Sequence, residues 1–173
     1  MDIEQIRGLV RDVPDFPQPG IVFKDITPLL ADEVAYSTVI DLIVLHFGRG
    51  SVDKVVGIEA RGFILAAPVA YHFGAGFVPV RKKDKLPWDT EAAEYVLEYG
   101  TATLEIHKDA VRQGERVLIV DDVLATGGTA RATADLVERV GGKVVGIACL
   151  IELGFLEGRK QIDGYDLFTL ITY

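Results

Sequence analysis

The sequence predicts an α/β protein with a doubly wound, mostly parallel sheet, and three observations support this prediction. Residues 117–120 are four branched apolar residues in succession, typical of a central strand buried on both faces. Residues 54–80 and 117–151 each have the pattern of strand, helix and strand, which predicts two right-handed parallel crossovers. The 173 residues contain no linker, repeat or low-complexity tract. We therefore expect one domain over residues 1–173.

The N-terminal part is predicted to be less regular. Apolar residues at helical spacing predict a short helix within residues 3–10 and a longer one from about 33 to 47. Between them, residues 13–20 hold three prolines, which fix their own φ angles and restrict the preceding residues. We expect this stretch to break regular structure. Thr27 and Pro28 can begin a further helical turn.

The rest of the chain alternates between strand and helix patterns. Strands are predicted at residues 54–58, 77–80, 117–120, 143–151 and 167–171, and helices at residues 63–73 and 130–140. Residues 94–106 alternate around Gly100, which indicates a hairpin or a bent excursion from the sheet. Polar clusters follow three of these strands, at residues 59–62, 81–83 and 121–122. Ligands in such sheets bind beyond the carboxyl ends of the strands, so the clusters should converge on one site.

The central strand is expected to stop at Asp121 and Asp122, before a glycine-containing loop and a helix. The two carboxylates can accept hydrogen bonds from the vicinal hydroxyls of a sugar. The loop glycines let the backbone approach an anion, which the free amides and the positive end of the helix can hold. This arrangement suits a ribose 5-phosphate. The loop residues are Ala125, Thr126, Gly127, Gly128 and Thr129.

Other nucleotide-binding motifs fit this stretch less well. A Walker A loop needs a lysine after its last glycine, and none follows Gly128. A dinucleotide-binding fold has its glycines before the acidic residue, whereas here the acids precede the glycines. An ordinary turn with two aspartates as polar punctuation is the remaining alternative, but the full thirteen-residue pattern argues against it.

Composition bounds the function. The net charge of −8 argues against a dedicated nucleic-acid surface, although residues 81–85 form a local basic cluster. Cys149 is the sole cysteine and lies in an apolar run, so we expect a core residue and no intramolecular disulfide. The three histidines lack metal-ligand spacing, which argues against zinc. Without a signal peptide or a membrane-spanning stretch, the expected location is cytoplasmic.

Residues 117–129 closely resemble the signature of the phosphoribosyltransferases that use 5-phosphoribosyl 1-pyrophosphate (PRPP). Four further segments resemble the adenine phosphoribosyltransferases within that family, namely residues 16–28, 59–63, 81–87 and 97–106. The match runs in order from about residue 16 to residue 152. The resemblance implies the type I fold with an N-terminal hood and a mobile lid. It also implies transfer of the 5-phosphoribosyl group from PRPP to adenine, giving AMP and pyrophosphate in purine salvage.

The resemblance also implies how PRPP is held. The ribose hydroxyls would meet Asp121 and Asp122, and the 5-phosphate would meet residues 125–129. Arg61 would face the leaving pyrophosphate as a catalytic residue, after a non-proline cis peptide at Glu59–Ala60. A helix-start arginine in a surface ion pair is the alternative. Cations that suit the same anion are Arg81 and Lys85. The alternative for Arg81 and Lys85 is a solvated basic turn. For Lys82 and Lys83, pyrophosphate binding and a solvated turn are equally good interpretations.

On the base side, the resemblance implies that the hood contacts adenine through the ring of Phe23 and the backbone of Val22 and Lys24. Alternatively, Phe23 is a core residue beside a polar turn. Glu98 is the implied catalytic acid or base near N7 of adenine, and a strand-surface glutamate is the alternative. Residues 153–156 would add apolar contacts to the base.

The lid implied by the resemblance runs from Lys85 to about Tyr95 and would exclude water during the reaction. Trp88 and Asp89 receive no role. Magnesium is expected to bind mainly through PRPP, so no protein metal ligand is predicted. The resemblance further implies a homodimer. Two rivals remain: transfer to xanthine, guanine or hypoxanthine, and a regulatory protein that keeps the PRPP-binding fold and binds nucleic acid.

Overall fold

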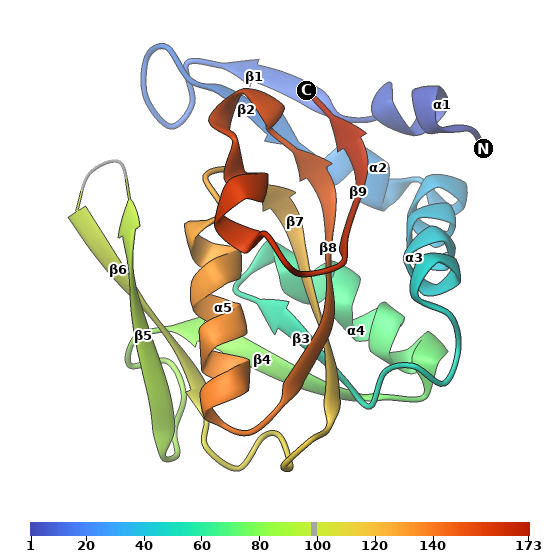
Figure 1. The fold of residues 1–173 in the computed structure, drawn as a ribbon. Coiled ribbons are helices and arrows are strands. Elements are labelled where there is room, and N and C mark those ends of the chain that lie inside the picture. Colours follow the sequence, from blue (N-terminus) through green and yellow to red (C-terminus); the bar gives the residue numbers. More distant parts are fainter. Residues whose placement is uncertain (98–99) are drawn as a thin grey trace. The chain divides into compact units, whose positions relative to one another are not determined.

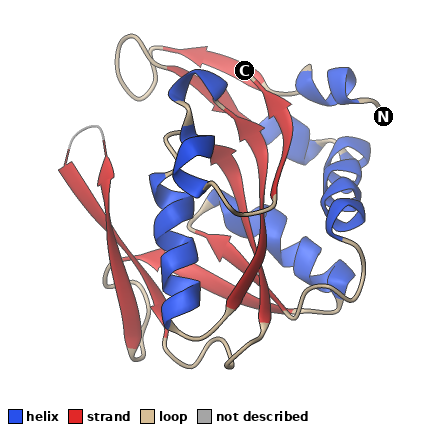
Figure 2. Cartoon of the chain, viewed as in Figure 1, coloured by secondary structure: helices blue, strands red, loops and turns tan. Residues whose placement is uncertain are grey.

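The computed structural model describes residues 1–97 and 100–173, and it confirms the α/β class. The described residues form two compact units, Met1–Leu42 and Ile43–Tyr173. Figures 1 and 2 show the helices and strands of each unit. No helix among the described residues has both the length and the apolar character needed to cross a bilayer.

The first unit is built from short elements. They are α1 (Ile3–Arg7), β1 (Arg11–Pro14), β2 (Val22–Asp25), α2 (Thr27–Ala31) and the first part of α3 (Glu33–Phe47). Asp2 caps α1, and Pro28 lies in the first turn of α2, as its sequence predicts. The expectation that residues 13–20 break regular structure was wrong at its start. Val13 and Pro14 belong to β1, which pairs antiparallel with β2, and a proline is tolerated there because it ends an edge strand.

The second unit holds a seven-stranded sheet with two long helices. Its strands are β3 (Lys54–Ile58), β4 (Gly76–Lys82), β5 (Thr90–Leu97), β6 (Gly100–His107), β7 (Arg116–Leu124), β8 (Lys143–Glu152) and β9 (Leu167–Thr172). Within the described residues their order is β5-β6-β4-β3-β7-β8-β9. The five strands from β4 to β9 in this order are parallel, whereas β6 runs antiparallel to both β4 and β5. The hairpin predicted around Gly100 is confirmed as β5 and β6.

Both predicted crossovers are present. Helix α4 (Arg61–Phe73) connects β3 to β4, and α5 (Gly128–Arg139) connects β7 to β8. The two connections leave the centre of the sheet in opposite directions, and the helices lie on opposite faces of it (Figure 1). The strand order therefore reverses between β3 and β7. In doubly wound sheets, this switch point is where ligands bind.

The central strand is buried as predicted, but it is longer. Residues 117–120 are fully buried. The expectation that the strand stops at the acidic pair was wrong, because β7 continues to Leu124. Its pairing with β3 ends at Val120, whereas its pairing with the ten-residue β8 continues to Glu152. Asp121 and Asp122 thus project from a strand that has lost one neighbour and kept the other.

Further local features differ from the sequence-based elements. Helix α5 begins at Gly128, two residues earlier than predicted, so the end of the loop is also the first turn of the helix. Two short 3₁₀ helices, η1 (Gly154–Leu156) and η2 (Gly158–Ile162), follow β8 and were not predicted. Such turns are too short to show apolar periodicity. Cys149 is confirmed as a buried core residue.

Candidate active site

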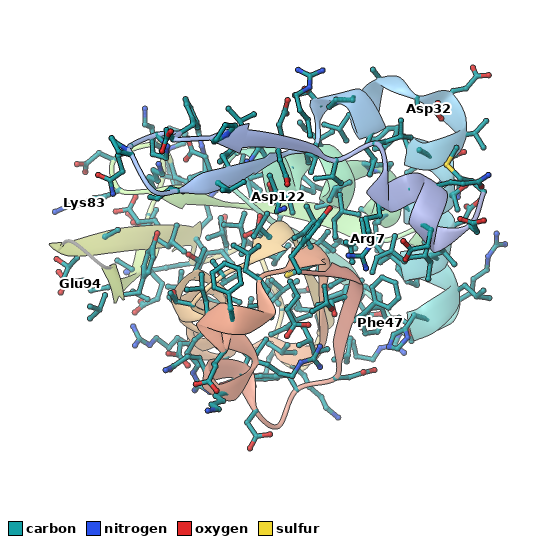
Figure 3. All side chains as sticks on the ribbon, turned by 90° about the horizontal axis from the view of Figure 1, so that it is seen from above. Arg7, Asp32, Phe47, Lys83, Glu94 and Asp122 are labelled. Carbon is teal, nitrogen blue, oxygen red and sulfur yellow. The ribbon has the colours of Figure 1, made fainter. Side chains whose placement is uncertain are left out.

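A cavity of about 250 Å³ lies at the switch point of the second unit. It is lined by residues of the turn after β3, of β7, of the loop before α5 and of the β5–β6 hairpin, including Glu59, Arg61, Asp121, Asp122, Ala125, Thr129 and Tyr95. Lys82, at the end of β4, also lines the cavity, so the convergence predicted from the sequence is confirmed for all three polar clusters. Figure 3 shows Asp122 among the inner side chains, with Lys83 and Glu94 at the periphery.

The two aspartates occupy different environments. Asp122 has a buried side chain, and its Oδ2 lies 2.8 Å from Nε of Arg61. Asp121 is half-buried, and its Oδ1 accepts a hydrogen bond of 2.9 Å from the Asp122 backbone N–H. Burial raises the pKa of Asp121 well above its usual range, and the Asp122 carboxylate raises it further. Burial also raises the pKa of Asp122, although the Arg61 charge opposes this.

Helix α4 begins directly beside this acidic pair. A Cβ atom added at Gly62 would lie 2.8 Å from Oδ1 of Asp121 and 3.0 Å from the Val120 carbonyl oxygen. Glycine thus permits the first turn of α4 to approach β7 closely at Val120 and Asp121. This close approach brings Arg61, at the start of the same helix, to Asp122.

The turn before Arg61 is tied to the end of β4. The Glu59–Ala60 peptide is cis, as the resemblance implies. The Glu59 carboxylate accepts hydrogen bonds from Arg81 Nε at 3.3 Å, from Arg81 Nη2 at 3.2 Å and from the Lys82 backbone N–H at 3.0 Å. Burial raises the pKa of Glu59, but these bonds to Lys82 and Arg81 outweigh it and hold the pKa below its usual value.

The basic cluster divides into one engaged side chain and several exposed ones. The Arg81 guanidinium donates two hydrogen bonds to the Glu59 carboxylate. It also donates from Nη1 to the Lys85 carbonyl oxygen at 3.3 Å. Lys82, Lys83 and Lys85 are exposed. Arg81 is thereby placed between the turn after β3 and the segment that leads to the hairpin.

The loop before α5 has the features of an anion site. Gly127 caps the helix with a φ of +85°, and no side chain among the described residues caps it by a hydrogen bond. The first amides of α5 are thus available to a ligand. Ala125 and Thr129 line the 250 Å³ cavity, whereas Thr126 and Gly128 line a neighbouring cavity of about 360 Å³. Tyr95 lines both.

A model of the phosphoribosyl transferase domain matches residues 27–172. The adenine phosphoribosyltransferase of Acidothermus cellulolyticus is 60% identical over 159 residues, covering 92% of this chain and 90% of that protein. The chain belongs to the adenine phosphoribosyltransferases.

Solved structures of this family have the same fold. The crystal structure of the adenine phosphoribosyltransferase from Thermoanaerobacter pseudethanolicus is 54% identical, with a TM-score of 0.95, and the match covers 99% of this chain and 100% of that one. The enzyme from Saccharomyces cerevisiae, complexed with an imino-altritol bisphosphate and adenine, is 38% identical with a TM-score of 0.92. That match covers 97% of each chain.

The residues assigned to adenine by resemblance to this family lie in β2 of the first unit. Val22 is half exposed. The Phe23 ring is partly buried and packs edge-on against Phe16, with ring centroids 5.2 Å apart. Lys24 Nζ lies 2.6 Å from Oδ1 of Asp12. Glu98 lies outside the described residues.

Sequence reasoning missed two residues that shape the site. Glu59 was read only as part of the turn, although a lone acid directly after a buried strand signals a polar role at the sheet edge. Tyr95 was read only as the end of the lid. Its side chain instead stands against the loop, because a Cβ atom added at Gly128 would lie 3.4 Å from Cδ2 of Tyr95. That contact joins segments more than 30 residues apart, so no local pattern could reveal it.

Proposed function

We propose that the chain transfers the 5-phosphoribosyl group of PRPP to adenine, giving AMP and pyrophosphate in purine salvage. One observation carries the proposal. The switch-point cavity combines a carboxylate pair, an arginine and an open helix N-terminus, in a chain 60% identical to an adenine phosphoribosyltransferase. Those groups match the hydroxyls, the pyrophosphate and the 5-phosphate of PRPP in chemical type.

The PRPP residues are assigned as follows. The hydroxyls of the ribose donate to Asp121 and Asp122, and the 5-phosphate binds the amides and hydroxyls of residues 125–129. Arg61 stabilises the charge that develops on the leaving pyrophosphate. Lys85, whose side chain is exposed, supplies a second cation. Arg81 belongs to the same subsite, where its bonds to Glu59 support the turn that carries Arg61.

Adenine is assigned to Val22, Phe23 and Lys24. The aromatic ring offers a face for the planar base, and the backbone of its two neighbours can read the hydrogen-bonding edge. Glu98 is assigned to proton transfer or hydrogen bonding at N7. These two assignments rest on the resemblance of residues 16–28 and 97–106 to the family.

The reaction itself places few demands on protein groups. N9 of adenine forms a bond to the anomeric carbon while the bond from that carbon to pyrophosphate breaks, with inversion. The transition state has oxocarbenium character, so the protein acts by positioning the reactants and stabilising the leaving charge. Closure of the lid, which residues 85–95 form, excludes water. Water otherwise competes with adenine for the anomeric carbon.

We also assign magnesium as the cofactor, bound mainly through oxygens of PRPP and water. Mg²⁺ keeps several waters and uses few carboxylates, which favours binding through the ligand. The resemblance to the family supports a homodimer and a cytoplasmic location. The match of the family model to residues 27–172 supports one functional domain over residues 1–173. Light scattering of the purified chain tests the dimer.

A base panel tests the proposed function directly. The chain is incubated with PRPP, Mg²⁺ and either adenine, guanine, hypoxanthine or xanthine, and nucleotide formation is followed. We expect AMP to form with adenine at a kcat/KM at least about 100-fold above that for the other bases, because a hydrogen-bonding edge discriminates strongly. If nucleotide formed only with a 6-oxopurine, adenine would be the wrong base and that 6-oxopurine would be the substrate. No nucleotide with any base, despite PRPP binding, would favour a regulatory protein.

A further inference from the structure

The loop assigned to the 5-phosphate is backed by the segment after β8. A Cβ atom added at Gly127 would collide with the Gly158 carbonyl oxygen and lie 2.9 Å from Cβ of Gln161. A Cβ atom added at Gly158 would collide with the Ala125 carbonyl oxygen and lie 2.9 Å from the Gly127 nitrogen. The two backbones therefore touch where neither has a side chain. The position of the loop depends on the position of Gly158.

Gly158 is held in turn by the residue that follows it. Arg159 donates from Nε to Oε1 of Glu152 at 3.0 Å and from Nη2 to Oε2 at 2.5 Å. Thr169 of β9 completes the group, since its hydroxyl donates to Glu152 at 2.9 Å and accepts from Arg159 at 3.2 Å. A bidentate arginine–carboxylate pair fixes both position and orientation.

The carboxylate of this pair is anchored more firmly than the arginine. The Glu152 side chain is 8% exposed and ends β8, which is hydrogen-bonded to β7 on one side and to β9 on the other. The Arg159 bond and the Thr169 hydroxyl lower the pKa of Glu152, although burial opposes them. The carboxylate is therefore charged at neutral pH. The Arg159 side chain is 54% exposed, and its ion pair with Glu152 connects η2 to the sheet.

We propose that Arg159 is a positioning residue for the 5-phosphate loop, acting through Gly158 and anchored by Glu152 and Thr169. This inference rests on the proposed function, because it takes residues 125–129 as the 5-phosphate site. It predicts that Arg159 governs the affinity for the phosphate end of PRPP without touching PRPP. The pyrophosphate end is carried by the turn after β3, which is held by Arg81, whereas Arg159 is bonded to Glu152 and Thr169.

The test compares Arg159→Gln with a matched control on the same segment. Lys160→Gln removes an exposed ion pair to Glu157, in which both side chains are more than 60% exposed. Titration calorimetry measures the Kd of ribose 5-phosphate and, separately, of pyrophosphate with Mg²⁺, and steady-state kinetics give KM for PRPP. Arg159→Gln should raise the Kd of ribose 5-phosphate and the KM of PRPP about tenfold, since small displacements of a binding group cost that much or more. The Kd of pyrophosphate should stay within about twofold.

Two further variants keep the test decisive if Arg159→Gln folds poorly. Arg159→Lys keeps one charge and loses the bidentate geometry, so its effect should be intermediate. Thr169→Val keeps the shape of the side chain and removes the hydroxyl, so the Kd of ribose 5-phosphate should rise severalfold. The inference is overturned if these variants match Lys160→Gln, or if both ligands weaken equally. Absence of AMP formation by the wild-type chain, with ribose 5-phosphate still bound, would instead overturn the proposed function.

Discussion

Nε of Arg61 lies 2.8 Å from Oδ2 of the buried Asp122, so two groups assigned to different parts of the same ligand are paired with each other. Asp122 is assigned to the ribose and Arg61 to the pyrophosphate. Under the proposed assignment, PRPP exchanges this ion pair for two new sets of contacts as it binds. The Arg61 side chain, 41% exposed, can turn toward the leaving group without crossing the core. The pair compensates the buried carboxylate until the ligand arrives.

The first prediction concerns the acidic pair. Replacing Asp121 and Asp122 together by asparagine should lower kcat/KM by at least about 100-fold, as when a charge-stabilising group is removed. The fold should survive, because asparagine keeps the shape and Arg61 is exposed enough to be hydrated. Steady-state kinetics and thermal unfolding measure the two effects. Full activity with an unchanged KM for PRPP would show that the ribose assignment is wrong.

The stability of the same double variant, relative to the wild type, should depend on pH. Both aspartates have pKa values raised in the folded chain, so they bind protons more tightly there than when unfolded. Their contribution to the free energy of unfolding is therefore largest below the unfolded pKa and declines as pH rises through the folded pKa. The double variant lacks this decline. Its stability relative to the wild type should grow from about pH 4 upward, as measured by urea unfolding at several pH values.

The sequence predicts the parts of the site that are local. Asp121 and Asp122 follow a run of buried apolar residues, and the loop after them carries its own glycine pattern, so strand, acids and helix could be placed together. The other parts of the site depend on which strands pair in the sheet. The end of β7 could not be predicted, because it depends on β8 continuing after β3 has stopped. The Glu59–Arg81 bond joins residues that are adjacent only because β3 and β4 are neighbours.

The contacts of glycines also cannot be predicted from local sequence patterns. Gly127 was read as a residue that lets the backbone approach an anion, and its φ of +85° agrees with a turn. Its second role, the contact with Gly158, joins positions 31 residues apart and leaves no periodic signal. A pattern can thus locate a binding loop while the support behind that loop remains invisible until the strands are arranged.

A second prediction concerns Glu59. Glu59→Gln keeps the shape but removes the charge that holds Arg81, and its amide cannot accept all three hydrogen bonds. The KM for PRPP should rise about tenfold, since misplacing a binding group costs this much or more. The KM for adenine should change little. Glu4→Gln, which changes a carboxylate that is 79% exposed and paired with Arg7, serves as the control. Equal effects of the two variants would remove Glu59 from the support of the site.

The third prediction separates the two roles proposed for Phe23. The KM for adenine should rise on the order of tenfold in Phe23→Leu, since stacking of a base on an aromatic ring contributes about 1–3 kcal/mol. The KM for PRPP should stay near the wild-type value. Phe16→Leu is the matched control, because it removes the ring that packs edge-on against Phe23 at 5.2 Å. If both variants raised the KM for adenine equally, Phe23 would be a packing residue of the first unit.

The last prediction concerns Glu98. If its carboxylate assists proton transfer at N7, Glu98→Gln should lower the rate of the chemical step by about 10²–10⁴-fold, the usual contribution of general acid–base catalysis. PRPP affinity should be nearly unchanged. Glutamine keeps the shape and removes the charge, which makes it more informative than alanine. Single-turnover mixing is required, because slow product release can hide a change in chemistry. An unchanged single-turnover rate would make Glu98 a surface glutamate and would leave the hood as the adenine-specific part of the proposed site.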